Sequence, residues 1–310
     1  MCTALHAHGC FGRTLDLEYT YAEQVVITPR DFPLVLRHLP PLTRHYAILG
    51  MATVADGYPL YYDAVNEQGL AMAGLHFPHS GRYTPVTEGA KNVVSFELIP
   101  YILGQCADIQ GARQVLQEIR VCDTAFSADF PPTRLHWMVA DGTGALVVES
   151  TADRLAVYDN LIGVMTNEPP FPFQLARWKE FARLTPYEPD PTPPQWGRGS
   201  GSLGLPGDFT SPSRLARAAF VAAHSEAEEN PVGQFFHAMA TVEVPRGGLR
   251  LPDGRRVVSQ YTSCMDLAQR VYYYRTYGCQ RIHGVRLTEV EGSTLAAYPL
   301  AKGEEVKWEN

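Results

Sequence analysis

The first 16 residues hold the side chains best suited to covalent chemistry. Cys2 directly follows the initiator methionine, and Arg13 and Asp16 lie within the same short segment. If Met1 is removed, Cys2 carries a thiol and a free α-amino group, and both groups titrate near neutral pH. An N-terminal amine can act as the general base for a nucleophile on the same residue. The segment therefore predicts nucleophilic acyl transfer by Cys2, with no need for a separate catalytic histidine.

Two polar residues further along the chain could complete such a site. Acyl transfer needs a donor for the oxyanion and polar groups that orient the nucleophile. Asn167 follows an apolar run and could donate its side-chain amide, or could simply end a strand. Arg214 lies in the first turn of a predicted helix, where a solvated charge is the simpler interpretation. Only the fold can bring these residues together with Cys2.

Two histidine pairs and one glycine-rich stretch could indicate other chemistries. His6 and His8, or His76 and His79, could bind a metal, but a catalytic zinc usually takes three protein ligands. His6 or His8 could also assist the thiol, although their spacing along one strand is unfavourable. Residues 199–204 match GxGxxG, but a dinucleotide motif must follow a strand and open a helix. This stretch follows a proline-rich loop, so we expect neither a metal nor a cofactor.

Length and composition favour a single globular domain over residues 1–310. Hydrophobic residues make up 45% of the chain and charged residues 19%, which is typical of a protein with a sizeable core. A net charge of −7 argues against a nucleic-acid partner. The sequence has no recognisable export signal and no run of 18 apolar residues, so we expect a cytoplasmic protein without a membrane partner. Six scattered cysteines without a CxxC pair predict free thiols.

Short apolar runs bounded by turn residues predict strands along most of the chain. The clearest pair flanks the turn DGTG at 141–144, which predicts a β-hairpin. The predicted strands are 24–28, 45–50, 69–75, 134–140, 145–150, 153–158, 161–167, 256–265, 269–277 and 281–287. Most of them are joined to a neighbour by a short turn, so antiparallel sheets are expected.

Helical periodicity separates these groups of strands. Asp108 could cap a helix in which apolar residues recur every three or four positions. Ser211 and Pro212 are typical of a helix N-cap and a first helical residue. The predicted helices lie within 92–120 and over 174–184, 211 to about 227, and 231–242, and a long proline-rich loop covers 185–208. The order of elements predicts an α+β fold, a four-layer αββα sandwich of two mainly antiparallel sheets.

Nine segments, taken in order, resemble the choloylglycine hydrolase family, which contains bile salt hydrolases and penicillin V acylases. The segments are Met-Cys-Thr at the start, FGRTLDLEY (11–19), VITPRDFP (26–33), YAILGM (46–51), NEQGLAMAGLHFP (66–78), LHWMVAD (135–141), GVMTNEP (163–169), GSLGLPGDFTSPSR (201–214) and QYTSCMD (260–266). The resemblance covers essentially the whole chain. It implies an N-terminal nucleophile hydrolase with an αββα fold, in which removal of the initiator methionine exposes a cysteine.

The same resemblance implies a role for each matching polar residue. Cys2 would be the nucleophile, with its own α-amine as the base. Arg13 and Asp16 would set the electrostatics of the thiol and the amine. Asn167 would donate its amide to the oxyanion, and Arg214 would hold the charge network of the site.

Position 76 departs from the family pattern, in which bile salt hydrolases commonly have Asn and penicillin V acylases have Tyr. Here the residue is His76. The resemblance implies that the backbone N–H of residue 76 is the second oxyanion donor. A backbone N–H is present whichever of these side chains the residue carries. A flat ring that can stack and hydrogen-bond is nearer to Tyr, so we expect a penicillin V acylase-like amidohydrolase, with N-acyl homoserine lactones as further candidate substrates. The alternative is a bile salt hydrolase that cleaves glycine- or taurine-conjugated bile acids.

Two further expectations concern assembly and activity. The resemblance implies a homotetramer, although residues 185–200, a region that helps assembly in the family, are several positions shorter here. A different class of function remains open, namely a binding or redox-sensing protein in which Cys2 is oxidised or blocked. Such a protein would bind a small-molecule N-acyl amide without turning it over.

Overall fold

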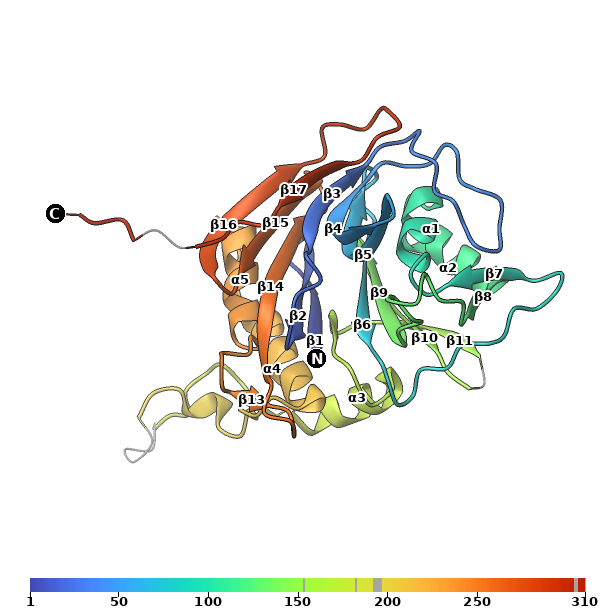
Figure 1. The fold of residues 1–310 in the computed structure, drawn as a ribbon. Coiled ribbons are helices and arrows are strands. Elements are labelled where there is room, and N and C mark those ends of the chain that lie inside the picture. The colour runs from blue at the N-terminus through green and yellow to red at the C-terminus, as the bar shows by residue number, and fades with distance from the viewer. Residues whose placement is uncertain (153, 182, 192–196, 304–305, 310) are drawn as a thin grey trace.

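Two large β-sheets face each other in the computed structural model, and helices cover the outer face of each (Figure 1). The structure describes residues 1–310 except 153, 182, 192–196, 304–305 and 310. The layers follow the order helix, sheet, sheet, helix. The predicted α+β fold, an αββα sandwich of two mainly antiparallel sheets, is therefore confirmed.

The first sheet has seven strands and contains the N-terminus. Its strand order is β12 (Val164–Met165), β1 (Cys2–Ala7), β2 (Cys10–Leu17), β14 (Arg256–Asp266), β15 (Val271–Thr276) and β16 (Cys279–Arg286), and β13 (Leu249–Arg250) pairs with β14. All of these pairings are antiparallel. The sheet thus places strands from the start, middle and end of the chain side by side.

The second sheet has eight strands, also antiparallel. Its order is β11 (Leu155–Asp159), β10 (Gly144–Ser150), β9 (Leu135–Asp141), β6 (Ala71–His76), β5 (Tyr58–Asn66), β4 (Ile48–Ala55), β3 (Gln24–Thr28) and β17 (Ala296–Pro299). A separate parallel pair joins β7 (Lys91–Val94) to β8 (Ile119–Cys122). The hairpin predicted around 141–144 is confirmed as β9 and β10.

Helices pack on the outer faces in two pairs. α1 (Leu98–Gln105) and α2 (Ile109–Glu118) cover the eight-stranded sheet, and α4 (Ser211–His224) and α5 (Pro231–Ala240) cover the seven-stranded sheet (Figure 1). α3 (Phe171–Trp178) packs against α4 and is followed by a 3₁₀ turn at Lys179–Phe181. In the described part of the chain, no helix combines the length and the apolar character needed to span a membrane.

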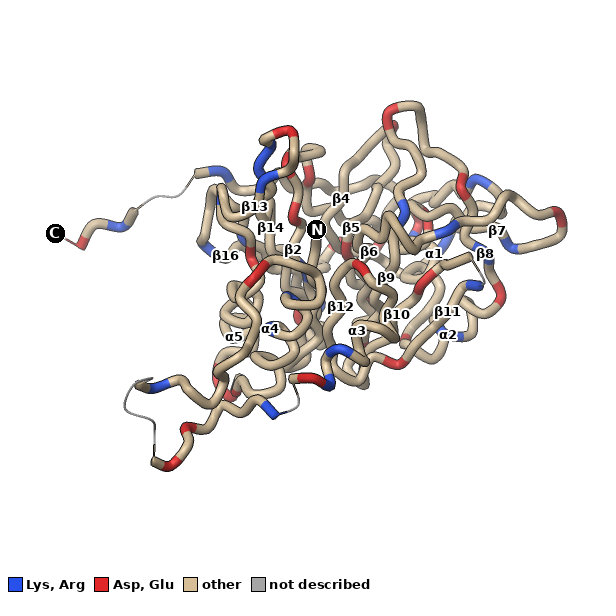
Figure 2. The backbone as a smooth tube through the Cα atoms, turned by 90° about the horizontal axis from the view of Figure 1, so that it is seen from below, with Lys and Arg blue, Asp and Glu red and all other residues tan. Residues whose placement is uncertain are grey.

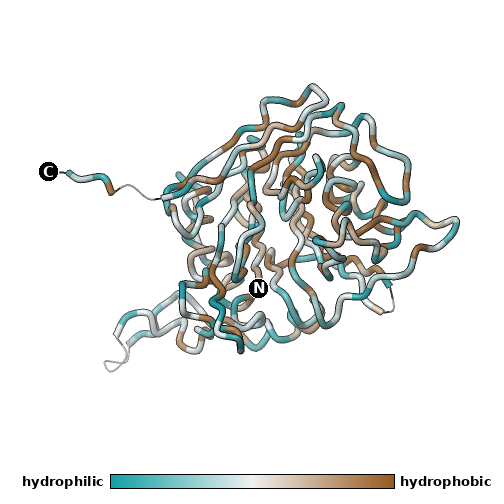
Figure 3. The backbone as a smooth tube through the Cα atoms, viewed as in Figure 1, coloured by the Kyte–Doolittle hydropathy of each residue, from teal (hydrophilic) through white to brown (hydrophobic). Residues whose placement is uncertain are grey.

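The alternation of side chains along the strands divides the interior into three cores. One lies between the sheets and includes Cys2 and Met138. The others lie under the helices: Leu98 and Trp137 belong to the core beneath α1 and α2, and Leu5 to the core beneath α4 and α5. Hydrophobic residues accordingly concentrate along the facing strands and helices, and hydrophilic ones in the loops (Figure 3). Cys2 is therefore on an inner face, whereas Leu5 of the same strand faces the helices.

Several predicted boundaries differ from the structure. The helical region 92–120 consists of two helices separated by residues 106–108 and flanked by β7 and β8. The predicted Asp108 cap is confirmed, because its carboxylate accepts from Gly111 N–H at 2.8 Å. The strand expected over 161–167 shrinks to two residues, because the chain turns at Gly163 with φ +66°.

The helix expected from Ser211 begins there, but Ser211 is not its cap. Thr210 occupies the N-cap position, and its hydroxyl donates to Ser213 Oγ rather than capping the backbone. Ser211 Oγ instead donates to Thr166. The loop over 185–208 lies partly outside the described residues. Strands β1, β2, β5, β13 and β17 lie outside every predicted strand range.

Candidate active site

The pairing of β1 with β2 places Cys2 and Arg13 on the face that looks toward the second sheet. Cys2 lies opposite Leu15, and Ala4 lies opposite Arg13. The guanidinium of Arg13 reaches along this face, and its Nη2 donates to Cys2 Sγ at 2.6 Å. Seen from below, the N-terminus lies between β2 and β6, the strands that bring the two sheets together here (Figure 2). The candidate nucleophile is therefore in direct contact with a cation.

Backbone carbonyls from both sheets fix the guanidinium of Arg13. Its Nε donates to Thr14 O at 3.1 Å, and its Nη1 donates to Gly74 O at 2.5 Å and Tyr62 O at 3.3 Å. The side chain is only 1% exposed. Burial opposes its charge, but nearby acidic groups, first among them the Cys2 thiol, raise the pKa of Arg13 above its ordinary value. A cation held on a thiol favours the thiolate, the form that attacks electrophiles.

Asn167 and Arg214 hold the main chain of Cys2. Cys2 N–H donates to Asn167 Oδ1 at 2.8 Å, and Arg214 Nη2 donates to the same oxygen at 2.8 Å. Arg214 Nη1 also donates to Cys2 O at 2.5 Å and to Thr3 Oγ1 at 2.6 Å. Arg214 is fully buried in the first turn of α4, so its interpretation as a solvated charge is wrong.

These contacts fix the orientation of the Asn167 amide. Because Oδ1 faces Cys2 and Arg214, Nδ2 points the other way and donates to His76 O at 2.8 Å. An amide nitrogen carries two hydrogens, so one remains for a developing oxyanion. His76 ends β6, and its side chain is exposed. The structure thus brings Asn167 and His76 together through the main chain of His76.

Asp16 lies beside the N-terminus, with its main chain and side chain in different contacts. Its carbonyl accepts from the Met1 amino group at 2.7 Å, and its N–H donates to Met1 O at 3.0 Å. Its carboxylate accepts from Ser259 Oγ at 2.6 Å and from Thr14 Oγ1 at 3.2 Å. The side chain is fully buried. All five predicted catalytic residues, together with His76, therefore lie in one connected cluster.

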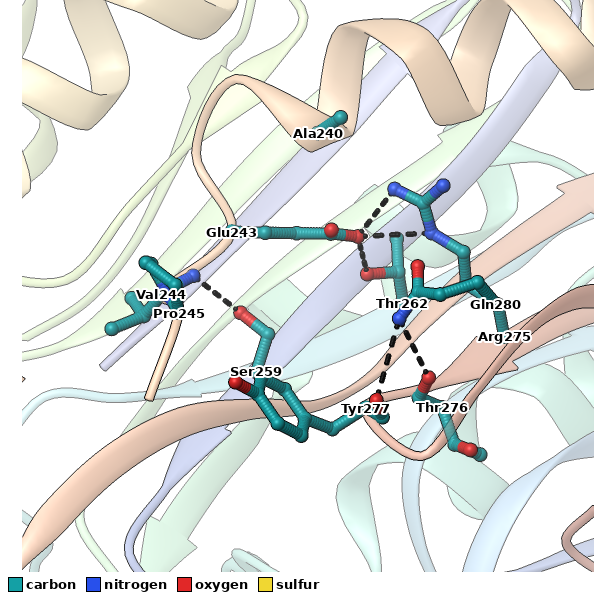
Figure 4. A pocket seen from close by; sticks show the side chains of 10 residues that line it. All are labelled: Ala240, Glu243, Val244, Pro245, Ser259, Thr262, Arg275, Thr276, Tyr277 and Gln280. Atoms are coloured by element: carbon teal, nitrogen blue, oxygen red, sulfur yellow. Dashed lines mark hydrogen bonds and ion pairs between the residues drawn. The ribbon is translucent and has the colours of Figure 1, made fainter. Parts of the chain in front are cut away.

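A pocket of about 270 Å³ lies behind this cluster, where β14 and β15 meet the segment that follows α5 (Figure 4). Ser259, the partner of Asp16, lines it. The polar groups of the pocket bind one another: Glu243 accepts from Thr262 Oγ1 and, at 2.7 and 3.1 Å, from Arg275. The predicted nucleophile and oxyanion donors do not line it. The thiol and the oxyanion donors therefore lie outside this pocket.

The remaining sequence candidates lie away from the thiol or are already satisfied. His8 Nε2 contacts Ser225 Oγ at 2.8 Å. The GxGxxG match at 199–204 forms a 3₁₀ turn, and the Glu188 carboxylate binds the backbone N–H groups of Gly199 and Ser200. A carboxylate at that position disfavours a phosphate. Among the residues that the structure describes, no group of three or more His, Cys, Asp and Glu side chains is placed to hold a metal.

Sequence reasoning missed several residues that support the cluster. Tyr62 supplies a carbonyl to Arg13, and Ser259 binds Asp16. Thr3 and Thr14 stand inside the recognised N-terminal motifs, so their small hydroxyl side chains next to predicted catalytic residues were an available signal. Ser259 had none, because a bulge between it and Tyr261 determines which face it occupies.

Comparison with known proteins agrees with this geometry. The family described as linear amide C–N hydrolases, choloylglycine hydrolase family, matches residues 2–294. A bile salt hydrolase/transferase of Lactiplantibacillus plantarum is 40% identical, and the alignment covers 97% of each chain. A bile salt hydrolase/transferase of Clostridium perfringens is 34% identical, and the alignment covers 97% of this chain and 98% of that one.

Solved structures separate the two substrate expectations. A cysteine-to-alanine mutant of the conjugated bile acid hydrolase of Clostridium perfringens superposes with a TM-score of 0.93 at 33% identity, over the whole of both chains. A penicillin V acylase of Agrobacterium tumefaciens gives a TM-score of 0.76 at 20% identity over 97% of this chain and 92% of that one, which shows a shared fold alone. The expected preference for penicillin V therefore has less support than its bile salt alternative. The chain belongs to the choloylglycine hydrolase family and is a hydrolase that acts on C–N bonds in linear amides.

Proposed function

We propose that this enzyme is a bile salt hydrolase that cleaves the amide bond between a bile acid and glycine or taurine. Relatives named as bile salt or conjugated bile acid hydrolases, at 28–40% identity, support this choice of substrate. The observation that carries the mechanism is a pair of hydrogen bonds to Cys2. Arg13 donates to the sulfur of Cys2, and Asn167 accepts from its nitrogen.

Removal of Met1 is the first step of the proposal. In the chain with Met1, the Met1 amine binds the carbonyl of Asp16, and Cys2 N–H binds Asn167 Oδ1. After cleavage, the nitrogen of Cys2 becomes the α-amine while Asn167 still holds it. The base is therefore positioned by contacts that already exist in the unprocessed chain, and Arg214 keeps the Cys2 carbonyl in place.

Acylation then proceeds within the cluster. The α-amine of Cys2 takes the thiol proton, and the thiolate attacks the amide carbonyl carbon. The oxyanion accepts from the second Asn167 Nδ2 hydrogen and from the backbone N–H of His76. When the tetrahedral intermediate collapses, the C–N bond breaks, and the α-ammonium gives its proton to the departing nitrogen of glycine or taurine. The acyl group stays on Cys2 as a thioester.

Deacylation uses the same groups. The α-amine takes a proton from water, and the resulting hydroxide attacks the thioester carbon, again with Asn167 and His76 as donors to the oxyanion. The C–S bond breaks, and the Cys2 sulfur leaves beside Arg13, which stabilises its negative charge. A free bile acid is released. The ammonium and thiolate of Cys2 then restore the starting state by proton exchange.

An aromatic cluster from two loops, one after β2 and one after β8, is the proposed binding surface for the apolar acyl group. Tyr19 and Tyr21 follow β2, and their ring centroids are 5.0 Å apart. The ring centroids of Tyr21 and Phe130 are 6.3 Å apart, and those of Phe130 and Phe126 are 6.1 Å apart. Tyr19 and Tyr21 are partly exposed. Exposed aromatic surface close to the end of β2 fits a rigid, apolar steroid-sized group.

One observation favours a second candidate, a penicillin V acylase-like activity that could include N-acyl homoserine lactones. The imidazole of His76 is exposed next to the proposed oxyanion donors. Such a ring could stack on a phenoxyacetyl group.

A homotetramer is the assembly that we propose, and size-exclusion chromatography with light scattering measures it directly.

The test is intact mass and turnover on one purified sample. We expect loss of the Met1 mass, release of taurine from taurocholate and glycine from glycocholate, and much slower release from penicillin V and an N-acyl homoserine lactone. Cys2→Ala should abolish each release, while Cys279→Ala, a control at another buried free cysteine, should not. Faster turnover of penicillin V than of both bile salts would replace the proposal with the second candidate. Ligand binding without turnover by the processed enzyme would favour the redox-sensing or binding alternative.

A further inference from the structure

The main chain of Asn167 is held by a side chain that the mechanism above does not use. Gln174 lies three residues after the start of α3 and is 1% exposed. Its Nε2 donates to Asn167 O at 2.7 Å and to Pro169 O at 2.6 Å. An amide nitrogen carries two hydrogens, so these two carbonyls use both of them. The orientation of the Gln174 amide is therefore fixed, and its Oε1 points the other way.

That oxygen continues the network to α4. Gln174 Oε1 accepts from Thr166 Oγ1 at 2.8 Å, and Thr166 Oγ1 accepts from Ser211 Oγ at 2.8 Å. Ser211 is the first residue of α4, and its hydroxyl makes this contact instead of capping the helix. Arg214 in the same turn donates to Asn167 Oδ1 at 2.8 Å. Asn167 is thus held at its carbonyl by α3 and at its side chain by α4, and Thr166 joins the two helices.

Asn167 depends on these contacts because it lies outside regular secondary structure. β12 ends at Met165 and α3 begins at Phe171, so neither a strand pairing nor a helix holds the residues between them. Among the described residues, no backbone N–H donates to the carbonyl of Asn167. The Gln174 side chain is therefore what fixes this carbonyl.

We propose that Gln174 is a positioning residue for the hydrolysis, which holds the main chain of Asn167 so that Nδ2 faces the developing oxyanion. The inference rests on the proposed role of Asn167 as an oxyanion donor. Such a donor acts only at hydrogen-bond distance from the position that the charged oxygen will take. A displacement of about 1 Å can cost about 100-fold in rate. Gln174 contacts no reacting group, so its effect passes through Asn167.

Gln174→Met keeps the approximate length and volume of the side chain but removes its donors and its acceptor. We expect kcat to fall about tenfold while KM stays within about twofold, because the loss acts on charge that appears only in the transition state. Alkylation of Cys2 by iodoacetamide at one pH should keep the wild-type rate, since this displacement forms no oxyanion and Arg13 still holds the sulfur. Thr166→Val removes the link from Gln174 to α4 and should lower kcat by a smaller factor.

The deciding experiment is a double-mutant cycle on the processed enzyme with taurocholate. In the Asn167→Ala background the main-chain carbonyl remains but the Nδ2 donor is gone, so Gln174→Met should lower kcat no further. Asn66→Ala is the matched control. Asn66 is also a buried amide whose Nδ2 donates to two backbone carbonyls, those of Leu103 and Cys106, each at 2.8 Å. This control should lower the melting temperature and leave kcat unchanged.

The outcomes are distinguishable. A lower melting temperature with wild-type kcat in Gln174→Met, as expected for Asn66→Ala, would make Gln174 a structural anchor only and overturn the inference. An equal loss of kcat with and without the Asn167 side chain, or a parallel loss of Cys2 alkylation, would overturn it as well. If Gln174→Met does not fold, the same cycle with Thr166→Val decides the question.

The cycle also separates this inference from the proposed function. Wild-type kcat in Asn167→Ala would refute the proposed oxyanion donor itself. A slow Asn167→Ala enzyme beside a Gln174→Met enzyme of wild-type kcat would leave that donor in place and refute only the role of Gln174.

Discussion

Arg13 Nη2 lies 2.6 Å from Cys2 Sγ, while Nη1 of the same guanidinium lies 2.5 Å from Gly74 O on the opposite sheet. One side chain thus connects the sulfur to the second layer of strands. Because the guanidinium is planar and rigid, a sulfur bound by Nη2 has a fixed position relative to the sheet that binds Nη1. The nucleophile is therefore positioned by the packing of the two sheets as well as by its own strand.

The first prediction concerns the sulfur itself. Cys2→Ala should lose all measurable turnover and keep its melting temperature within a few degrees, since the side chain is small. Cys2→Ser should fold equally well and lose most activity, because a hydroxyl is a weaker nucleophile than a thiol. Turnover of taurocholate and differential scanning fluorimetry measure the two properties. Ordinary activity in Cys2→Ala would exclude Cys2 as the nucleophile.

The second prediction concerns the guanidinium. Arg13→Lys retains the charge, but one ammonium cannot bind the Cys2 sulfur and the Gly74 carbonyl with the same geometry. We expect kcat/KM to fall about 100-fold, with a partial recovery at high pH where the thiol ionises without help. The exposed Arg44→Lys serves as the control. An unchanged pH profile in Arg13→Lys would show that the contact with sulfur has no catalytic effect.

The third prediction concerns the oxyanion. Asn167→Ala removes the Nδ2 donor, and loss of one such donor typically lowers kcat by about 100- to 1,000-fold. KM should change less, because the donor acts mainly on charge that develops in the transition state. The same variant also frees Cys2 N–H from its acceptor. A rise in KM at unchanged kcat would assign Asn167 to substrate binding instead.

Much of this site could be predicted, because it depends on motifs that are local in sequence. Cys2, Arg13 and Asp16 stand within the first 16 residues, and the structure shows that this segment is the β1–β2 hairpin. Asn167 and Arg214 each follow a recognisable element boundary. Their resemblance to family motifs implies their roles, and the structure brings these residues into one cluster with Cys2.

The supporting residues could not be predicted, because they depend on how the sheets pack. Asp63 lies on β5, a strand whose sequence YPLYYDAVN mixes polar and apolar residues without clear alternation. The pairing of β5 with β4 also contains a register shift between Met51 and Ala52. The three hydroxyl groups that donate to the carboxylate of Asp63 come from strands of the first sheet, about 200 positions away in the sequence. Ser259 reaches Asp16 because of a bulge in β14. A register shift moves side chains between faces and is not visible in a hydrophobic pattern.

The fourth prediction concerns the aromatic cluster. Phe130→Ala should raise KM for taurocholate several-fold while kcat changes little, because the ring contacts Tyr21 at the proposed acyl-binding surface and lies away from the reacting groups. Leu161→Ala is the control, since Leu161 is 94% exposed and outside the cluster. Steady-state kinetics with taurocholate measure the change. Equal KM values in the two variants would place the acyl group elsewhere.

The fifth prediction concerns Glu97, which holds the loop that supports this cluster. Its carboxylate accepts from Arg37 N–H at 2.7 Å, and Arg37 in turn donates to Phe126 O at 2.9 Å. Burial raises the pKa of Glu97 to about 7. Between the ordinary pKa of about 4.3 and this value, the folded protein keeps a proton that the unfolded chain has lost, so the free energy of unfolding falls as pH rises.

Glu97→Gln removes this titration and keeps an acceptor for Arg37. Relative to the wild type, the variant should therefore gain stability between pH 5 and pH 8, by on the order of 1 to 3 kcal/mol. Urea denaturation at both pH values measures the difference, and Glu118→Gln, at an exposed glutamate, is the control. A difference between wild type and Glu97→Gln that is the same at pH 5 and pH 8 would mean that Glu97 ionises in the folded protein as it does in the unfolded chain. The protonation state of Glu97 would then not change across this range, and the KM for taurocholate should not vary with pH through Glu97.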